Sequence, residues 1–161
     1  MRRLAVLVSA AVLFALAGAA SAATIPQATY VKRADAICLD VARQALALQQ
    51  EARRRVGSAT DDAAALRVFA DIYRRQLTLI RSMRRRLVAI GEPRGAATTP
   101  RLLIGGIGKG ELALRDVIAA VDSGSTAAVV RTATQYRNVS LASARAVSRS
   151  PLGFRACGAG A

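Results

Sequence analysis

The sequence contains no histidine and no tryptophan, and its 161 residues include only two cysteines. Without histidine, no imidazole can activate a serine nucleophile, and no Ser-x-x-Lys pair offers a substitute. Two cysteines are too few for a structural zinc site. The ten acidic residues leave room for a carboxylate pair, but none lies on the apolar helix faces described below. We therefore predict a protein that is not an enzyme and that holds no metal or cofactor. A small secreted enzyme is the least supported alternative.

Aromatic residues are also scarce, with three Tyr and three Phe, whereas alanine is abundant. The core must therefore be built from Leu, Ile, Val and Ala side chains. Small side chains let helices approach one another closely, so this composition favours a helical bundle over a sheet. The length suits one domain with one core.

The first 22 residues have the pattern of a secretory signal peptide. Arg2 and Arg3 precede an apolar run from Leu4 to Ala17, and Ala20-Ser21-Ala22 is a small-residue cleavage site. We predict a signal peptide over 1–22 and a single domain over 23–161, located in a secreted or periplasm-like extracytoplasmic space. The alternative is retention by an uncleaved N-terminal anchor.

Four segments have helical periodicity, each bounded by turn residues. The expected helices run from Thr29 to Val56, from Asp61 to Ile90, from Pro100 to Ser123-Gly124, and from Ser125 to Pro151. Apolar or small residues recur every three or four positions in each. These positions are Ala34, Cys38, Val41, Ala45, Leu48 and Ala52; Leu66, Phe69, Tyr73, Gln76, Ile80, Met83, Leu87 and Ile90; Leu103, Ile107, Gly110, Leu114, Val117 and Val121; and Val129, Thr132, Tyr136, Val139, Ser143 and Ala146.

The residues at the helix ends suggest specific caps. Gly57 is expected to cap the end of the first helix, and Thr60 the start of the second. Thr99 is expected to cap the third helix, with Pro100 at its first position.

Four such helices with short connections predict an all-α, antiparallel up-down four-helix bundle. That topology places the end of the fourth helix beside the start of the first. Cys38 lies in the first helix, and Cys157 lies just beyond the fourth. Because an exported chain meets an oxidising compartment, we predict a Cys38–Cys157 disulfide that closes the bundle.

Two short motifs suggest a relationship to other proteins. An ADAIC stretch spans residues 34–38, and a GF..CG pattern spans residues 153–158. The chain thereby resembles a group of small actinobacterial exported helical proteins, many of them lipoproteins and most of them uncharacterised. The resemblance implies a fold and an extracytoplasmic location but lends no activity. The chain departs from the lipoprotein members at Ala19, where they carry the lipidated cysteine.

The segment Gly105–Gly110 contains four glycines inside the third expected helix. It fits neither a P-loop nor a dinucleotide-binding pattern, because Glu111 stands at the critical position and no strand precedes it. Glycines inside a helix cost about 0.8–1 kcal/mol each relative to alanine. We expect close packing of a facing aromatic such as Phe69 or Tyr73, or a local break in the helix. A small apolar pocket opened by the missing side chains is the alternative.

The chain has a formal net charge of +14, mostly from arginine. Arg67, Arg74, Arg81 and Arg85 fall within about 40° of one another on the second helix, opposite its apolar face. They form a candidate anion-binding face, although an ordinary solvated face, partly paired through Asp71 and Arg75, is the simpler interpretation. Nucleic acid is not the expected ligand, since base stacking needs exposed aromatic side chains and the chain has only six Phe and Tyr residues (three of each).

We therefore predict an exported, non-enzymatic binding or structural component of the cell envelope whose partner is unknown. The alternative is a module that binds an anionic envelope polymer or lipid headgroups through the Arg face.

Overall fold

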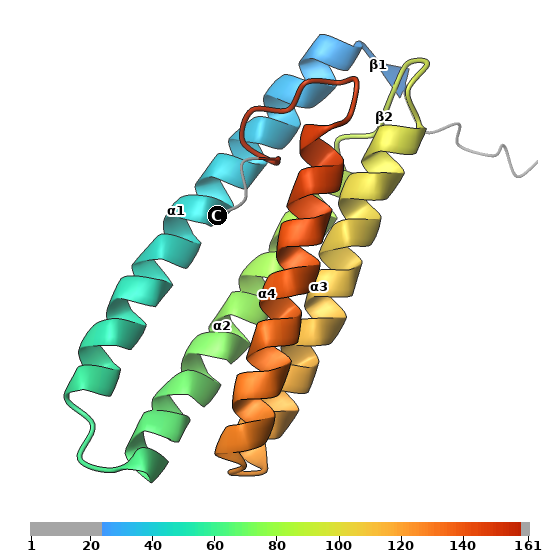
Figure 1. The fold of residues 1–161 in the computed structure, drawn as a ribbon. Helices are drawn as coiled ribbons and strands as arrows, with labels where there is room; N and C mark the ends of the chain where they lie inside the picture. Colours follow the sequence, from blue (N-terminus) through green and yellow to red (C-terminus); the bar gives the residue numbers. More distant parts are fainter. Residues whose placement is uncertain (1–23, 159–161) are drawn as a thin grey trace, which may run out of the picture.

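The computed structural model describes residues 24–158, which form an antiparallel four-helix bundle (Figure 1). The helices are α1 (Gln27–Gly57), α2 (Asp62–Val88), α3 (Thr98–Asp122) and α4 (Thr126–Ser148). This confirms the predicted fold class. The predicted signal segment lies outside the described residues.

The two helix starts with polar caps show how local chemistry fixes the boundaries. At α2, the carboxylate of Asp61 accepts a hydrogen bond of 2.7 Å from the backbone N–H of Ala64. At α4, the Ser125 hydroxyl accepts one from Ala128, as its position just before the helix suggests. The expectation of a Thr60 cap is therefore wrong, because the neighbouring aspartate takes the capping position.

Two other expected caps are also wrong. Thr99 lies inside the first turn of α3 and is buried, while Ala97 precedes the helix without a side-chain cap. Gly57 is the last residue of α1 and does not adopt a positive φ, so Ser58 occupies the capping position. Gly124, in contrast, has a φ of 71° and ends α3 where glycine is favoured.

A two-residue parallel pairing between β1 (Thr24–Ile25) and β2 (Glu92–Pro93) was not predicted from the sequence. The backbone N–H of Arg94 also donates to the carbonyl of Ile25 at 2.9 Å. The pairing attaches the segment before α1 to the linker between α2 and α3 (Figure 1).

Two groups of buried side chains make up most of the core. The first, the disulfide-end cluster, draws on all four helices and on the segment after α4. It comprises Tyr30, Ala34, Leu87, Leu103, Val147 and Phe154. The second, the distal cluster, comprises Ala70, Leu77, Leu114, Val117 and Val121, and the side chains packed against it also come from α2, α3 and α4. α1 therefore contributes to only one of the two clusters.

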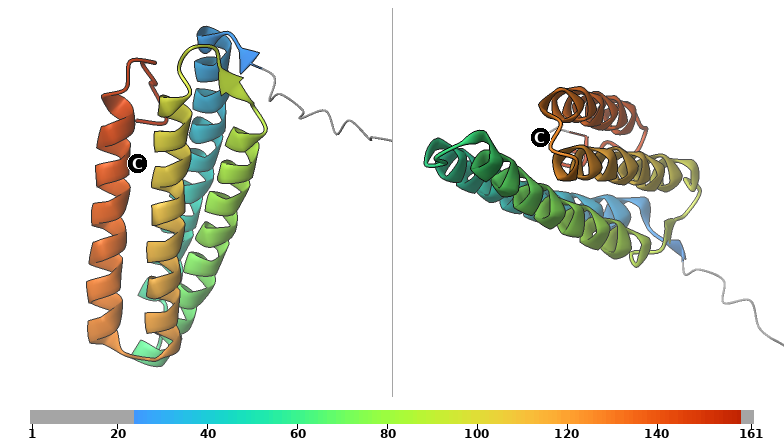
Figure 2. Two further views of the ribbon diagram at one scale, coloured as in Figure 1. Left: turned by 90° about the vertical axis from the view of Figure 1, so that its right-hand side faces the viewer. Right: turned by 90° about the horizontal axis from the view of Figure 1, so that it is seen from below.

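The helices pack as two hairpins, α1 with α2 and α3 with α4, joined through the contact between α2 and α3 (Figure 2). α1 and α4 do not pack along their lengths, and Figure 1 shows α1 diverging from α4 away from the C-terminal segment. The C-terminal segment instead returns from α4 to α1 and carries Cys157 to Cys38. The gap between α1 and α4 determines the site described next.

Candidate functional site

A groove of about 460 Å³ lies between α1 and α4, with α2 and α3 as its floor. All four helices and the C-terminal segment line it, and most of the lining side chains are apolar or small. Its volume falls within the range of about 300–1,000 Å³ that is typical of small-molecule sites. The groove exists because α4 packs on α3 and leaves its α1-facing side uncovered.

Two glycines of the Gly105–Gly110 segment form part of this groove. A Cβ placed on Gly106 would lie 2.9 Å from the Cβ of Ser143, so α3 and α4 approach too closely there for a larger residue. A Cβ on Gly110 would lie 4.0 Å from the Tyr136 ring. α3 continues through this segment without a break. The expectation of Phe69 or Tyr73 as the facing aromatic is wrong; α4 provides the facing side chains.

The groove differs in polarity from one end to the other. At one end, the side-chain amide of Gln76 donates a 3.0 Å hydrogen bond to the Tyr136 hydroxyl, and Arg137 and Ser140 lie nearby in the lining. Burial raises the pKa of Tyr136, which keeps its hydroxyl protonated. Towards the other end, the lining consists of apolar residues such as Met83, Leu103 and Val147.

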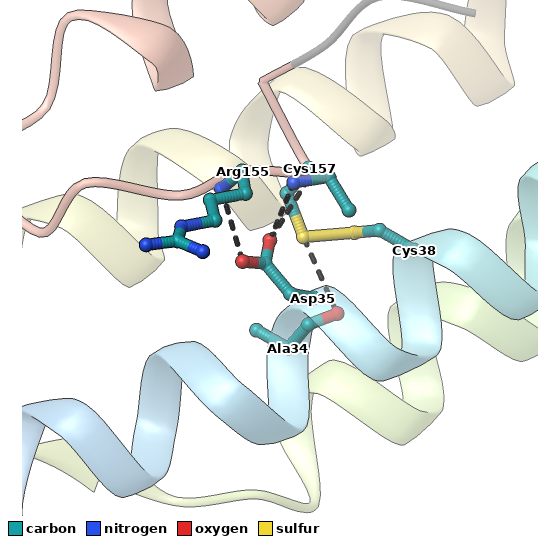
Figure 3. The surroundings of a disulfide bond; sticks show 6 residues. Ala34, Asp35, Cys38, Arg155 and Cys157 are labelled. Atoms are coloured by element: carbon teal, nitrogen blue, oxygen red, sulfur yellow. Dashed lines mark hydrogen bonds between the residues drawn. A yellow bond between two sulfur atoms is a disulfide. The ribbon is translucent and has the colours of Figure 1, made fainter.

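The Cys38–Cys157 disulfide closes the apolar end of the groove, with the two Cα atoms 5.2 Å apart. This confirms the predicted pairing. The Cys157 sulfur also lies 3.3 Å from the carbonyl oxygen of Ala34 (Figure 3).

The carboxylate of Asp35 holds the same segment in place. Its oxygens accept hydrogen bonds from the backbone N–H groups of Arg155, Ala156 and Cys157 at 2.9–3.1 Å (Figure 3). Sequence reasoning missed this role. The available signal was the spacing, because a residue three positions before Cys38 lies one turn away on the same side of the helix. Asp35 thus positions the chain that seals the groove.

The four arginines of the candidate anion-binding face lie on α2, and two of them are paired with acids of α3. Arg74 binds Asp122 at 2.6 Å, and Arg81 binds Glu111 at 3.0 Å. Arg67 and Arg85 take part in none of the ion pairs formed among residues 24–158. The face is therefore interrupted by carboxylates.

A second hollow, of about 410 Å³, lies beside this face. Its lining includes Arg67 and Arg74 but also Asp71 and Asp122. The two arginines and the two aspartates carry equal and opposite formal charge. The hollow therefore has no net positive charge with which to attract an anion. The expected pairing of Asp71 with Arg75 is present at 3.7 Å.

Glu111 is a buried acid that the sequence analysis did not place in the core. Its side chain is 10% exposed and binds Arg81 at 3.0 Å and Arg115 at 2.7 Å, with Arg84 at 3.8 Å. The hydrogen bond from Arg81 lowers the pKa of the carboxyl group, against the opposing effect of burial. The statement that no acid lies on an apolar face is therefore wrong: Glu111 follows Gly110 on the buried side of α3, where arginines neutralise it.

Comparisons with protein-family models, with curated proteins and with solved structures gave no match. Between residues 24 and 158, no group of three or more acidic, cysteine or histidine side chains is arranged to hold a metal ion. Over the same range, no helix is long and apolar enough to cross a membrane.

Proposed function

We propose that the protein is an exported, non-enzymatic binding protein of the cell envelope that holds a small apolar molecule in the groove between α1 and α4. The observation that carries the proposal is the groove itself, with its apolar lining drawn from all four helices. A bundle with no ligand to bind has no need to leave such a surface uncovered, since closing it would bury more apolar area.

Two further features support this proposal. The disulfide fits export to an oxidising compartment, where such a bond persists. The chain lacks histidine, and the polar side chains of the groove form hydrogen bonds without a nucleophile–base pair. Binding without chemistry is the simplest use of this arrangement.

The alternative, an anion-binding face at Arg67, Arg74, Arg81 and Arg85, has less support. Two of the four guanidinium groups are engaged by α3 carboxylates, so the free charge is smaller than the sequence implies. That alternative requires retention on anionic vesicles that falls steeply with salt and disappears when all four are changed to Gln.

The groove is tested with N-phenylnaphthylamine, an uncharged dye that fluoresces in apolar surroundings. The purified protein should enhance its fluorescence saturably. Ala144→Phe places a ring in the groove and should abolish the enhancement, whereas Ala142→Phe, on the exposed side of the same helix, should not. Ala45→Phe fills the groove from the α1 wall and provides a second, independent block.

Circular dichroism and the melting temperature show whether each variant remains folded. Equal dye binding by folded Ala144→Phe, Ala45→Phe and Ala142→Phe proteins would contradict the proposal, because the dye would then be bound elsewhere.

A further inference from the structure

The distribution of charged side chains in the groove indicates which kind of ligand it can bind. Arg137 is the one charged residue in the lining formed by residues 24–158, and no carboxylate lines the groove. Arg137 is exposed on α4 and takes part in none of the ion pairs formed in that range. A single guanidinium at the edge of an apolar groove complements a single negative charge on an otherwise apolar molecule.

The longer polar side chains also lie at one end, and the serines between the two ends, Ser140 and Ser143, carry only hydroxyl groups. Gln76, Tyr136 and Arg137 mark that end, and the disulfide with Ala156 marks the other. Ten residues of α4 separate Arg137 from Val147, which corresponds to about 15 Å along the helix. The lining between them is mostly apolar, since the Ser143 hydroxyl is bonded to the carbonyl of Val139, and the exposed side chain of Leu141 flanks the mouth of the groove.

We infer that the ligand is a single-chain fatty acid, with its carboxylate at Arg137 and its alkyl chain directed towards the Cys38–Cys157 disulfide. This inference rests on the proposed function and specifies its ligand. The planar guanidinium binds a carboxylate through two parallel hydrogen bonds. A zwitterionic headgroup would need an acid for its cation, and the groove lining offers none.

The test compares two molecules that differ only in the headgroup, lauric acid and lauryl alcohol, as competitors that displace N-phenylnaphthylamine at neutral pH. The wild-type protein should release the dye at laurate concentrations roughly tenfold lower than those of the alcohol, reflecting one charge-assisted hydrogen-bonded contact. Arg137→Gln should remove this preference by raising the laurate concentration that is needed to that of the alcohol. Arg137→Lys should restore part of it.

Arg131→Gln is the matched control, because it removes the same charge from an exposed position of α4 outside the groove lining. It should retain the preference for laurate. Loss of the preference in Arg131→Gln to the same extent as in Arg137→Gln would overturn the assignment, since general charge attraction would then account for it.

Different results would contradict the proposal of an apolar binding groove and the inference of a fatty-acid ligand. Equal displacement by laurate and the alcohol in the wild type overturns the fatty-acid inference but leaves an apolar binding site. Tighter displacement by lauryl phosphate than by laurate likewise overturns the carboxylate assignment. Absence of binding for laurate, alcohol and dye, measured directly by calorimetry, overturns both.

Discussion

The two ends of the bundle are built differently. In the disulfide-end cluster, side chains from all four helices and the C-terminal segment meet, and Tyr30, Leu87 and Ala34 are fully buried. In the distal cluster, only α2, α3 and α4 pack together. The distal part of α1 buries Leu48 and is linked to α2 through partly exposed ion pairs. In these pairs, Arg75 of α2 donates to Glu51 at 2.7 Å and Arg55 of α1 pairs with Asp71 of α2.

The difference between the two ends shows how a small bundle can leave a groove between two helices and still be stable. Exposed ion pairs contribute little, typically about 0–1 kcal/mol each. The disulfide-end cluster, the disulfide and the buried side chains of Val41 and Leu48 must therefore supply most of the stabilisation that holds α1 in place. The rest of α1 is then free of α4, and the groove lies between them.

The largest effect is expected from removing the disulfide. Changing Cys38 and Cys157 to Ser should lower the free energy of unfolding by about 4–5 kcal/mol, because the bond closes a long loop in the unfolded chain. The separation of the two residues is 119 positions. Urea unfolding of the variant and the wild type measures the loss.

A loss below about 1 kcal/mol would contradict this expectation, because it would show that the bond does little to restrict the unfolded chain. Two free thiols found by mass spectrometry of the native protein would contradict the disulfide itself.

A smaller loss of stability is expected from alanine substitutions on α2, and its size should differ between a core residue and a residue of the groove wall. Leu87→Ala should cost about 2–5 kcal/mol, because Leu87 has no exposed surface. Ile80 is only partly buried and lines the groove, so Ile80→Ala should cost about 1 kcal/mol. Thermal and urea unfolding of the two variants provide the comparison. Equal losses would show that the groove is filled by packing rather than open.

The smallest effect concerns pH. The pKa of Glu111 is lowered in the folded protein, principally by the hydrogen bond from Arg81. Its stabilisation is therefore fully present above the ordinary carboxyl pKa of 4.5 and is lost as the pH falls through the lower, folded-state pKa. The melting temperature of Glu111→Gln should accordingly vary less with pH in this acid range than that of the wild type.

Asp116→Asn is the control for the loss of one negative charge, because Asp116 is exposed on the same helix and takes part in none of the ion pairs formed among residues 24–158. If the Glu111→Gln and wild-type profiles have the same slope, the carboxylate is not the group that titrates.

The sequence was sufficient to predict the helices because they follow regular apolar patterns, and the disulfide because the antiparallel order of the helices places Cys157 beside Cys38. The positions at three-four spacing on α3, from Leu103 to Val121, are mostly buried as expected. On α4 the pattern was extended to Ala146, which is exposed, whereas Val147 is the buried residue. Steps of three and four are both compatible with one helix face, so the choice between neighbouring residues depends on which helix lies opposite.

The groove could be predicted only as an alternative interpretation of the glycine segment. The sequence shows that four glycines weaken a helix, but not which helix approaches them. Position 106 requires a glycine because Ser143 of α4 leaves no room for a Cβ atom. These two residues lie 37 positions apart in the sequence. The ion pair between Glu111 and Arg81 was missed for the same reason, because Arg81 lies on a different helix. Arg115, four positions after Glu111, was the local signal. Contacts between distant segments carry no local sequence pattern.

Each helix packs mainly against the helices that precede and follow it in the sequence, and this determines the order in which the parts of the fold can form. Each packed helix pair, α1 with α2, α2 with α3 and α3 with α4, joins consecutive elements, and contacts of this kind form rapidly. The meeting of the C-terminal segment with Asp35 and Cys38 spans about 120 positions and requires the slower closure of a long loop and the oxidation of two thiols. The helices should therefore assemble first and the groove acquire its closed end last, so that oxidation is the step that completes the groove.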